Sequence, residues 1–261
     1  MVLVERLLAG DTRALARAIS LVEENVPEAA PLLRAVFARG GAANVVGITG
    51  APGAGKSSLL HRLVTEHRAR GRRVGVVAID PSSAFSGGAI LGDRVRMQEH
   101  ATDPGVFIRS MATRGHLGGL ARATHDVVDL VAAAGYDPLL VETVGVGQDE
   151  IDVVRLADAV AVVLMPGAGD DIQAIKAGIL EIADLFVINK ADQPGADRLE
   201  SDLRSMLALA PAPRRTPEIL RTVAVTGEGV GALADHLARF LESLDPAARA
   251  ERRRERARAR L

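Results

Sequence analysis

The sequence predicts an α/β protein with a mostly parallel central sheet flanked by helices, an N-terminal helical extension and a C-terminal helix. Two observations lead to this fold class. Short, nearly continuous apolar runs alternate along the chain with stretches of helical periodicity, a pattern typical of parallel strands that are covered on both faces. A glycine-rich segment, GITGAPGAGKSSLL (47–60), lies between the first apolar run and the helical stretch that follows it.

The region before the alternation carries apolar residues at helical spacing, and we expect two helices over residues 12–39. We therefore place an N-terminal helical extension at 1–42, the main domain at 43–244 and a basic C-terminal tail at 245–261. The last thirteen residues, RAERRRERARARL, contain seven Arg and two Glu. A solvated helix is the favoured interpretation of this tail, and an arm that contacts a partner is the alternative.

Seven apolar runs are the expected strands: 44–49, 73–79, 105–108, 138–143, 160–165, 185–189 and 222–226. Helical stretches lie between most of them, at 56–70, 117–134, 172–183, 197–209 and 229–243. Right-handed crossovers would bring the C-terminal ends of the strands to one edge of the sheet, where ligands bind in folds of this class.

The composition excludes several classes of function. The chain of 261 residues is 48% hydrophobic but only 2% aromatic, so a surface that stacks nucleic-acid bases on aromatic rings is not expected. A net charge of −1 provides no bulk field for nucleic acid or membrane. There is no cysteine for disulfides or thiolate metal sites, which fits a cytoplasmic location, and no uncharged apolar run is long enough to span a bilayer.

The segment GAPGAGKS (50–57) matches G-x-x-x-x-G-K-[ST] at every fixed position, and it lies between an expected strand and an expected helix. Glycines let backbone amides approach phosphate oxygens, and the helix N-terminus adds its dipole. Lys56 is expected to reach the terminal phosphates, Ser57 to ligate Mg²⁺ and Ser58 to contact the inner phosphate. The predicted phosphate-binding residues are Gly50, Ala51, Pro52, Gly53, Ala54, Gly55, Lys56, Ser57 and Ser58.

The string NKAD (189–192), directly after an apolar run, indicates guanine as the base. Asp192 can accept hydrogen bonds from the guanine ring N–H and exocyclic amine, whereas adenine offers no matching donors there. Asn189 can bridge the base and the phosphate loop, and the stem of Lys190 can lie against the ring. A second base loop is expected in TGEG (226–229), although an ordinary strand-to-helix turn would look similar. Its backbone amides, those of Thr226, Gly227 and Glu228, would face the guanine oxygen.

Hydrolysis of GTP to GDP and phosphate requires Mg²⁺ and a sensor of the terminal phosphate. Asp80 and Glu142 end two apolar runs and would face the phosphates, and Asp93 in GGAILGDRVRM is a third candidate. Each could instead be a helix cap or a solvated loop carboxylate. Gly145 in ETVG can supply a backbone amide to the terminal phosphate. No residue is clearly the group that positions water. The predicted catalytic residues are Lys56, Asp93, Glu142 and Gly145.

Together these motifs resemble the cobalamin-linked P-loop GTPases that chaperone acyl-CoA mutases, the MeaB/ArgK family. The resemblance extends over about residues 14–240. Its matching stretches are ALARAISLVEENVPEA, GITGAPGAGKSS, AIDPSSAFSGGAILGDRVRM, LVETVGVGQDE, PGAGDDIQAIKAGILEIAD and NKAD. DPSS, GGAILGD and ETVGVGQ in combination are far more specific than a P-loop alone.

The resemblance implies a slow GTPase that a partner mutase stimulates. Such a protein gates adenosylcobalamin loading and protects or reactivates a cobalamin-dependent acyl-CoA mutase similar to methylmalonyl-CoA mutase. It implies that Ser57, Asp80, Asp93 and Glu142 surround Mg²⁺. It also implies a third switch in PGAGDDIQAIK, with Asp170, Gln173 and Lys176 as the residues that signal to the mutase. The family usually continues into a longer helical arm that contributes to dimerisation, and because this chain stops at Leu261, a homodimer stays open.

Three other functions compete with this one. A small-molecule kinase, of the kind labelled transport-system kinase, could use Arg94, Arg96 and Arg114 as a lid, but NKAD argues against it because most such kinases use ATP. A metal insertase of the same GTPase class would need clustered Cys or His, whereas the six His are scattered. A GTP-binding switch without catalysis is the third.

Overall fold

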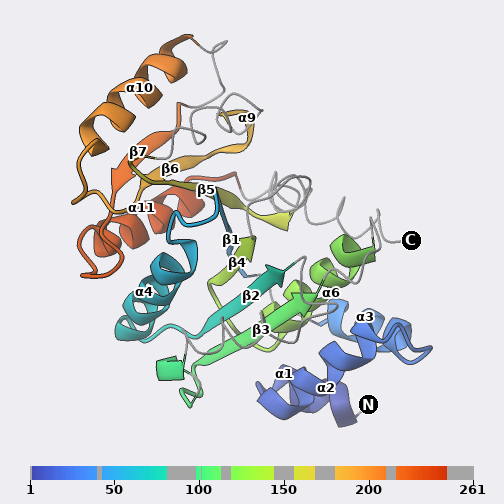
Figure 1. Cartoon of the computed structure of the whole chain (residues 1–261). Coiled ribbons are helices and arrows are strands. Elements are labelled where there is room, and N and C mark those ends of the chain that lie inside the picture. Colours follow the sequence, from blue (N-terminus) through green and yellow to red (C-terminus); the bar gives the residue numbers. More distant parts are fainter. Residues whose placement is uncertain are drawn as a thin grey trace. The chain divides into compact units, whose positions relative to one another are not determined.

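A computed structural model of the chain describes residues 2–39, 43–80, 98–100, 102–112, 119–143, 156–167, 180–209 and 216–245 (Figure 1). Within these residues a seven-stranded sheet has the order β3-β2-β4-β1-β5-β6-β7. The strands are β1 (Val45–Thr49), β2 (Val74–Asp80), β3 (Val106–Ala112), β4 (Leu139–Thr143), β5 (Ala159–Leu164), β6 (Leu185–Ile188) and β7 (Glu218–Arg221). The pairs β2–β3, β1–β5, β5–β6 and β6–β7 are parallel, which confirms the predicted fold class.

The described residues fall into two compact units. Of the described residues, the first unit is formed by the chain up to Val45 and by the stretch from His67 to Leu140, and the second by Val46–Glu66 and residues 141–245. The predicted boundaries 1–42, 43–244 and 245–261 remain predictions, and residues 246–261 of the tail lie outside the described part. No helix of the described ranges is both long enough and apolar enough to cross a membrane.

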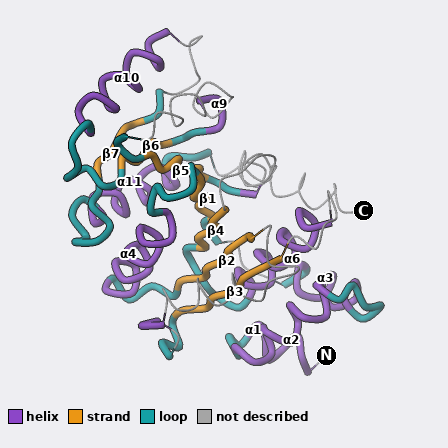
Figure 2. Tube along the Cα trace, viewed as in Figure 1, coloured by secondary structure: helices purple, strands orange, loops and turns teal. Residues whose placement is uncertain are grey.

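The first unit begins with three helices, α1 (Val2–Leu8), α2 (Thr12–Glu23) and α3 (Ala29–Phe37) (Figure 2). The two helices expected over residues 12–39 are present, and α1 is an addition. Asp11 is the N-cap of α2, because its carboxylate accepts hydrogen bonds from the backbone amides of Arg13 and Ala14. The apolar face of α2 is buried, so these helices belong to the core of the unit.

Helix α6 (Gly119–Ala133) is the central helix of this unit. It packs against β2 and β3 and also against α2 and α3, and its residues Val127 to Val131 are largely buried. Arg109 of β3 forms an ion pair with Glu23 of α2, which adds a polar tie between the N-terminal helices and the sheet. The N-terminal helices therefore cover a helix that would otherwise expose an apolar face.

Tyr136, the only tyrosine of the chain, is fully buried after α6. The guanidinium of Arg73 lies 4.1 Å from the centre of its ring, and the ring of Phe107 lies 5.7 Å away, centre to centre. Arg73 also donates to the carbonyl of Ala134 at 3.0 Å. The tyrosine hydroxyl is 3.4 Å from that of Thr12, at the start of α2. One aromatic side chain thus joins the sheet, α6 and the N-terminal helices.

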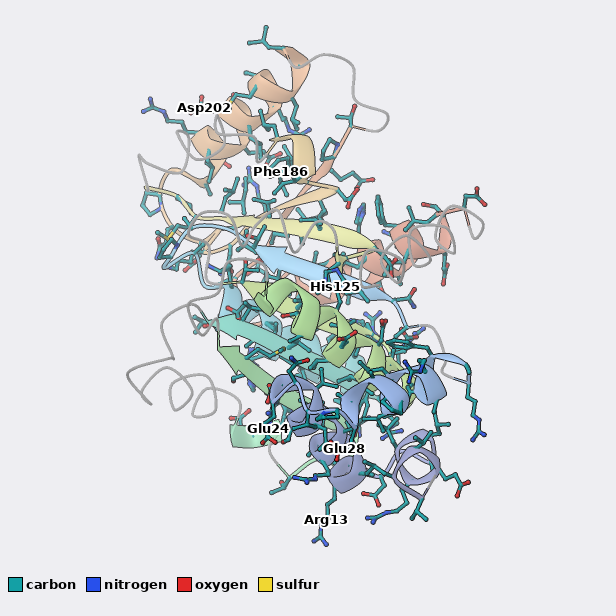
Figure 3. The ribbon with its side chains drawn as sticks, turned by 90° about the vertical axis from the view of Figure 1, so that its right-hand side faces the viewer. Arg13, Glu24, Glu28, His125, Phe186 and Asp202 are labelled. Atoms are coloured by element: carbon teal, nitrogen blue, oxygen red, sulfur yellow. The ribbon has the colours of Figure 1, made fainter. Side chains whose placement is uncertain are left out.

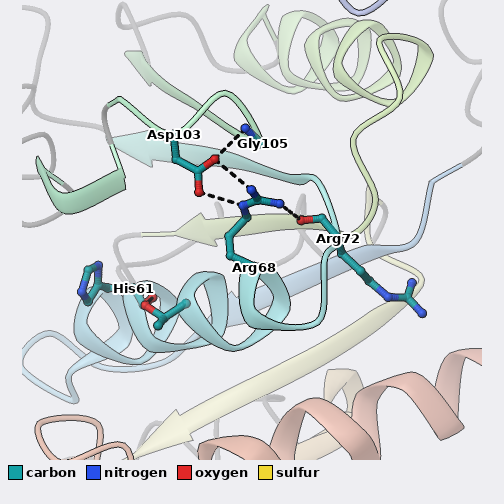
Figure 4. A network of polar contacts seen from close by, with 6 residues as sticks. His61, Arg68, Arg72, Asp103 and Gly105 are labelled. Carbon is teal, nitrogen blue, oxygen red and sulfur yellow. Dashed lines mark hydrogen bonds and ion pairs between the residues drawn. The ribbon is translucent and has the colours of Figure 1, made fainter.

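A polar network at the C-terminal end of α4 (Lys56–Ala69) fixes the entry into β3 (Figure 4). Arg68 donates from Nε and Nη2 to the two carboxylate oxygens of Asp103, at 2.8 and 2.9 Å. Its Nη1 donates to the carbonyl of Arg72 at 2.6 Å, and the amide of Gly105 donates to Asp103 at 2.8 Å. The hydrogen bonds from Arg68, and then that from Gly105, hold the pKa of Asp103 below its ordinary value.

We expect Arg68→Met to lower the free energy of unfolding by about 1–2 kcal/mol, because Asp103 loses the two donors of Arg68 and the Arg72 carbonyl loses its donor. Since the pKa of Asp103 is lower in the folded state, the stabilisation is complete above the ordinary aspartate pKa of about 3.9 and disappears as the pH falls through the folded value. Urea unfolding of both proteins from pH 7 to pH 2.5 measures this. Arg13→Met, at an exposed position of α2, is the control. A difference that stays constant with pH would contradict the argument.

The second unit contains β1 from Val46 onward, together with β5, β6 and β7. Its helices include α4 up to Glu66, α10 (Ala196–Leu209) and α11 (Val230–Glu242). All residues of β1, β5 and β6 are buried, as the continuous apolar runs predict for strands with both faces covered. Phe186 of β6, labelled in Figure 3, has no exposed surface. Of the predicted helix 172–183, the structure describes only the end, which includes α9 (Leu180–Ile182).

The position of the last strand was predicted wrongly. We expected it at 222–226, but β7 is formed by Glu218–Arg221, which pairs with β6 so that Leu185 lies opposite Glu218. β7 is the last strand in the sheet order, and its side chains are exposed or half-buried, so it carries no apolar run. Thr222, Val223 and Ala224 are buried after the strand and begin a loop that leads to α11.

Candidate nucleotide-binding site

The glycine-rich segment forms a tight turn between β1 and α4, within the second unit. Gly50 has φ +137°, and a Cβ at this position would lie 2.1 Å from the carbonyl oxygen of Val163 in β5. Any side chain at residue 50 would therefore push the loop away from the sheet. Gly55, with φ +87°, adopts a left-handed conformation that also favours glycine. The backbone of the predicted phosphate loop thus requires the glycines of the motif.

Lys56 is the first residue of α4, and its side chain is folded back over the loop. Its Nζ donates to the carbonyl of Gly50 at 2.7 Å and to that of Ala51 at 3.0 Å. The residue is only 6% exposed. A buried ammonium at a helix N-terminus, beside amides with no helical partner, produces a strongly anion-attracting position.

Ser57 and Glu142 meet directly. The Ser57 hydroxyl donates to Oε1 of Glu142 at 2.7 Å, and the carboxylate, which follows Val141 in β4, is buried. The next residue of β4, Thr143, donates from its hydroxyl to the hydroxyl of Thr49, the last residue of β1, at 3.0 Å. A hydroxyl and a carboxylate oxygen are ligand types that Mg²⁺ prefers, so this pair fits the predicted metal position. No group of three or more metal-ligating side chains occurs among the described residues.

Asn189 connects the phosphate loop to the region that follows β7. Its Nδ2 donates to the carbonyl of Ala54 at 2.8 Å, and its Oδ1 accepts from the hydroxyl of Thr222 at 3.2 Å and from the amide of Ala224 at 3.0 Å. The side chain is 1% exposed. A Cβ on Gly55 would lie 2.4 Å from Nδ2, so the glycine also makes room for this amide.

Of the other charged residues of NKAD, Lys190 is half-buried and Asp192 is exposed. Lys190 has φ +54°, and its Nζ lies 3.4 Å from the sulfur of Met165. Asp192 is exposed, in the turn before α10. The carboxylate of Asp192 is accessible to a ligand that lies against the loop.

The backbone amides expected to face the guanine oxygen have other partners in this structure. The amides of Thr226 and Gly227 donate to the carbonyl of Val223 at 3.1 and 2.8 Å. The amide of Glu228 donates to the Thr226 hydroxyl at 3.3 Å. The loop is therefore closed on itself at these three residues.

The remaining predicted site residues lie outside the described part of the chain. They are Asp93, Gly145, Asp170, Gln173 and Lys176, together with the side chain of Asp80, whose backbone ends β2. Two contacts of the described site were not anticipated. Arg62 of α4 donates to the carbonyls of Ala224 and Val225. No local sequence signal predicts this, because the residues are 162 and 163 positions apart in the chain.

A parallel α/β sheet, a glycine-rich loop before a helix, a Ser–carboxylate pair and a buried Asn that ties this loop to the end of the sheet define a P-loop GTPase. Comparison with known families agrees. The chain belongs to the family described as methylmalonyl Co-A mutase-associated GTPase MeaB, whose model matches residues 15–261. The predicted family and the predicted GTPase activity are thereby confirmed.

Proteins named as GTPases are similar over most of the chain. One from Pyrococcus abyssi is 52% identical over 256 residues, which cover 97% of this chain and 79% of that protein. One from Mycobacterium bovis is 42% identical over a match that covers 94% of this chain and 76% of that protein. A protein of Caenorhabditis briggsae named methylmalonic aciduria type A homolog, mitochondrial, is 38% identical. The match covers 97% of this chain and 66% of that protein.

Two solved structures show the same fold. That of a protein named LAO/AO transport system kinase has a TM-score of 0.80 at 29% identity and covers 98% of this chain and 79% of its own. HypB from Helicobacter pylori, in complex with nickel, has a TM-score of 0.56 at 17% identity. The match covers 82% of this chain and 93% of the HypB chain. At that identity the likeness to HypB concerns the fold alone.

Proposed function

We propose that this GTPase is a chaperone that gates adenosylcobalamin loading and protects or reactivates a cobalamin-dependent acyl-CoA mutase. The observation that carries the proposal is the match to a family of mutase-associated GTPases over residues 15–261. The similarity to a methylmalonic aciduria type A homolog supports the same class of partner. We further propose a cytoplasmic location and a homodimer.

We propose that GTP occupies the second unit, with its phosphates over residues 50–58 and its base against residues 189–192. The buried ammonium of Lys56 supports the first assignment, since it can exchange two loop carbonyls for phosphate oxygens. The exposed carboxylate of Asp192 supports the second, because it can accept both donors on the Watson–Crick edge of guanine.

We propose that Ser57 and Glu142 hold Mg²⁺, with Asp80 and Asp93 as further ligands. The 2.7 Å contact between the Ser57 hydroxyl and the Glu142 carboxylate supports this, since both oxygens can face one small cation. When bound, Mg²⁺ would neutralise charge on the phosphate oxygens. Gly145 would sense the terminal phosphate through its backbone amide. The residues proposed to signal to the mutase are Asp170, Gln173 and Lys176.

The decisive test measures GTP hydrolysis by the purified chain with and without a purified cobalamin-dependent acyl-CoA mutase, and with ATP in place of GTP as a control. We expect slow turnover of GTP alone, a severalfold or greater stimulation by the mutase, and no turnover of ATP. GTP turnover that no mutase of a methylmalonyl-, isobutyryl- and ethylmalonyl-CoA panel changes would contradict the chaperone role and leave the GTPase intact. Turnover of ATP alone would overturn the assignment of the base.

A further inference from the structure

Arg62 lies on the first half of α4, on the helix that begins with Lys56, and its guanidinium reaches the loop after β7. Nε donates to the carbonyl of Ala224 at 3.0 Å, and Nη2 donates to the carbonyl of Val225 at 2.6 Å. Two donors of one rigid, planar group therefore hold two consecutive peptide carbonyls. This arrangement fixes the orientation of the loop more tightly than a single hydrogen bond to a flexible side chain.

The contact to Ala224 also orients the next amide. In a trans peptide the C=O of one residue and the N–H of the following residue lie in one plane and point in opposite directions. By holding the carbonyl of Ala224, Arg62 sets the direction of the Val225 N–H, which points away from the guanidinium. On the other side of Ala224, its own amide donates to Oδ1 of Asn189 at 3.0 Å. Ala224 is thus held through both its amide and its carbonyl.

Val225 differs from its neighbours in what its amide does. The amides of Ala224, Thr226, Gly227 and Glu228 all donate within the protein. Among the hydrogen bonds of the described residues, none uses the amide of Val225. The residue is 77% exposed and is one of the few large apolar residues at the described surface. An oriented amide beside an exposed apolar side chain suits a flat heterocycle with an acceptor at its edge.

We propose that Arg62 is a positioning residue for base recognition: it aims the Val225 N–H at the 6-oxygen of guanine, while the Val225 side chain covers one face of the ring. This inference rests on the proposed position of the nucleotide in the second unit. It replaces the amides of Thr226, Gly227 and Glu228 as the donors to that oxygen. Arg62 itself does not touch the nucleotide and acts only through the peptide between Ala224 and Val225.

A ligand pair that differs only at the 6-position separates this role from a purely structural one. 6-Thio-GDP keeps the ring N–H and the exocyclic amine that Asp192 can bind, but it carries sulfur, a weak acceptor, in place of oxygen. If Arg62 merely braced the fold, its loss would weaken both ligands by the same factor. If it aims the amide, its loss would weaken GDP and leave 6-thio-GDP nearly unchanged.

The experiment titrates GDP and 6-thio-GDP against the wild-type chain, Arg62→Met and Arg62→Lys. The wild type should bind GDP about tenfold more tightly than 6-thio-GDP, the equivalent of one hydrogen bond. In Arg62→Met this ratio should fall to about one, through a loss confined to GDP. Arg62→Lys, which keeps the charge but loses the fork of donors, should also lose most of the ratio. Arg204→Met, which removes an arginine paired with Glu200 on α10, is the matched control and should keep it.

Three outcomes are distinguishable. An unchanged ratio in Arg62→Met, with folding intact by circular dichroism, would overturn the role of Arg62. An equal loss of affinity for GDP and 6-thio-GDP would also overturn it, because Arg62 would then only stabilise the fold. Failure of the wild-type chain to bind GDP at all would instead contradict the proposed nucleotide site.

Discussion

Lys56→Met is expected to lower kcat/KM for GTP hydrolysis by at least about a hundredfold, because the ammonium proposed to stabilise charge on the phosphates is removed. The side chain is buried, and it already donates to the carbonyls of Gly50 and Ala51. Methionine keeps most of the apolar stem, so the packing around the start of α4 should survive. The loss should therefore appear in activity and in nucleotide affinity rather than in folding.

The measurement is steady-state GTP hydrolysis over a range of GTP concentrations, with thermal unfolding as a check on the fold. Arg198→Met, at a side chain that is 88% exposed on α10, is the control and should keep the wild-type rate. An Lys56→Met protein within about threefold of the wild-type kcat/KM would show that the phosphates bind elsewhere.

Asn189→Ala should produce the largest loss of stability in the site, about 2–4 kcal/mol in the free energy of unfolding. The substitution deprives three groups of their partner: the carbonyl of Ala54, the hydroxyl of Thr222 and the amide of Ala224. These atoms are buried, so water cannot readily replace the lost amide group. Nucleotide affinity should fall as well, because both loops lose a common anchor.

Denaturant unfolding and GDP titration of the two proteins measure these effects. The matched control is Asp192→Ala, in the same tetrapeptide but exposed, which should change stability by less than about 0.5 kcal/mol and still lose guanine affinity. Equal free energies of unfolding for Asn189→Ala and Asp192→Ala would contradict the role of Asn189 as a structural anchor of the two loops.

The sequence was sufficient for the features that depend on local spacing. The phosphate loop needs its glycines where φ is positive, and such positions follow directly from G-x-x-x-x-G-K-[ST]. The apolar runs predicted the buried strands because both faces of each are covered. The same pattern did not predict β7, because this strand is the last in the sheet order and its residues Glu218 and Arg221 are exposed.

The contacts between distant segments could not be predicted. The hydrogen bonds from Arg62 to Ala224 and Val225 depend on how α4 packs beside the end of the sheet, and an arginine on a helix carries no sign of its acceptor. The internal closure of residues 226–228 likewise depends on turn geometry that TGEG leaves open. The presence of these turns was therefore predictable, whereas the hydrogen-bond partners of their backbone amides were not.

The bond between Asn189 and Ala54 has a consequence for how the ligand is held. In the proposed site, the loop for the phosphates and the loop for the base share the buried side chain of Asn189, so the two ends of a bound nucleotide would meet loops that are tied to each other. Once one end is bound, the other is presented at a high effective concentration without further ordering of the protein. Guanosine and pyrophosphate, added as separate molecules, would each lose translational entropy on binding, and each loss would weaken the binding of that molecule. We therefore expect the covalent link in GDP to add to affinity because the two proposed loops are already tied together, without a contact of its own.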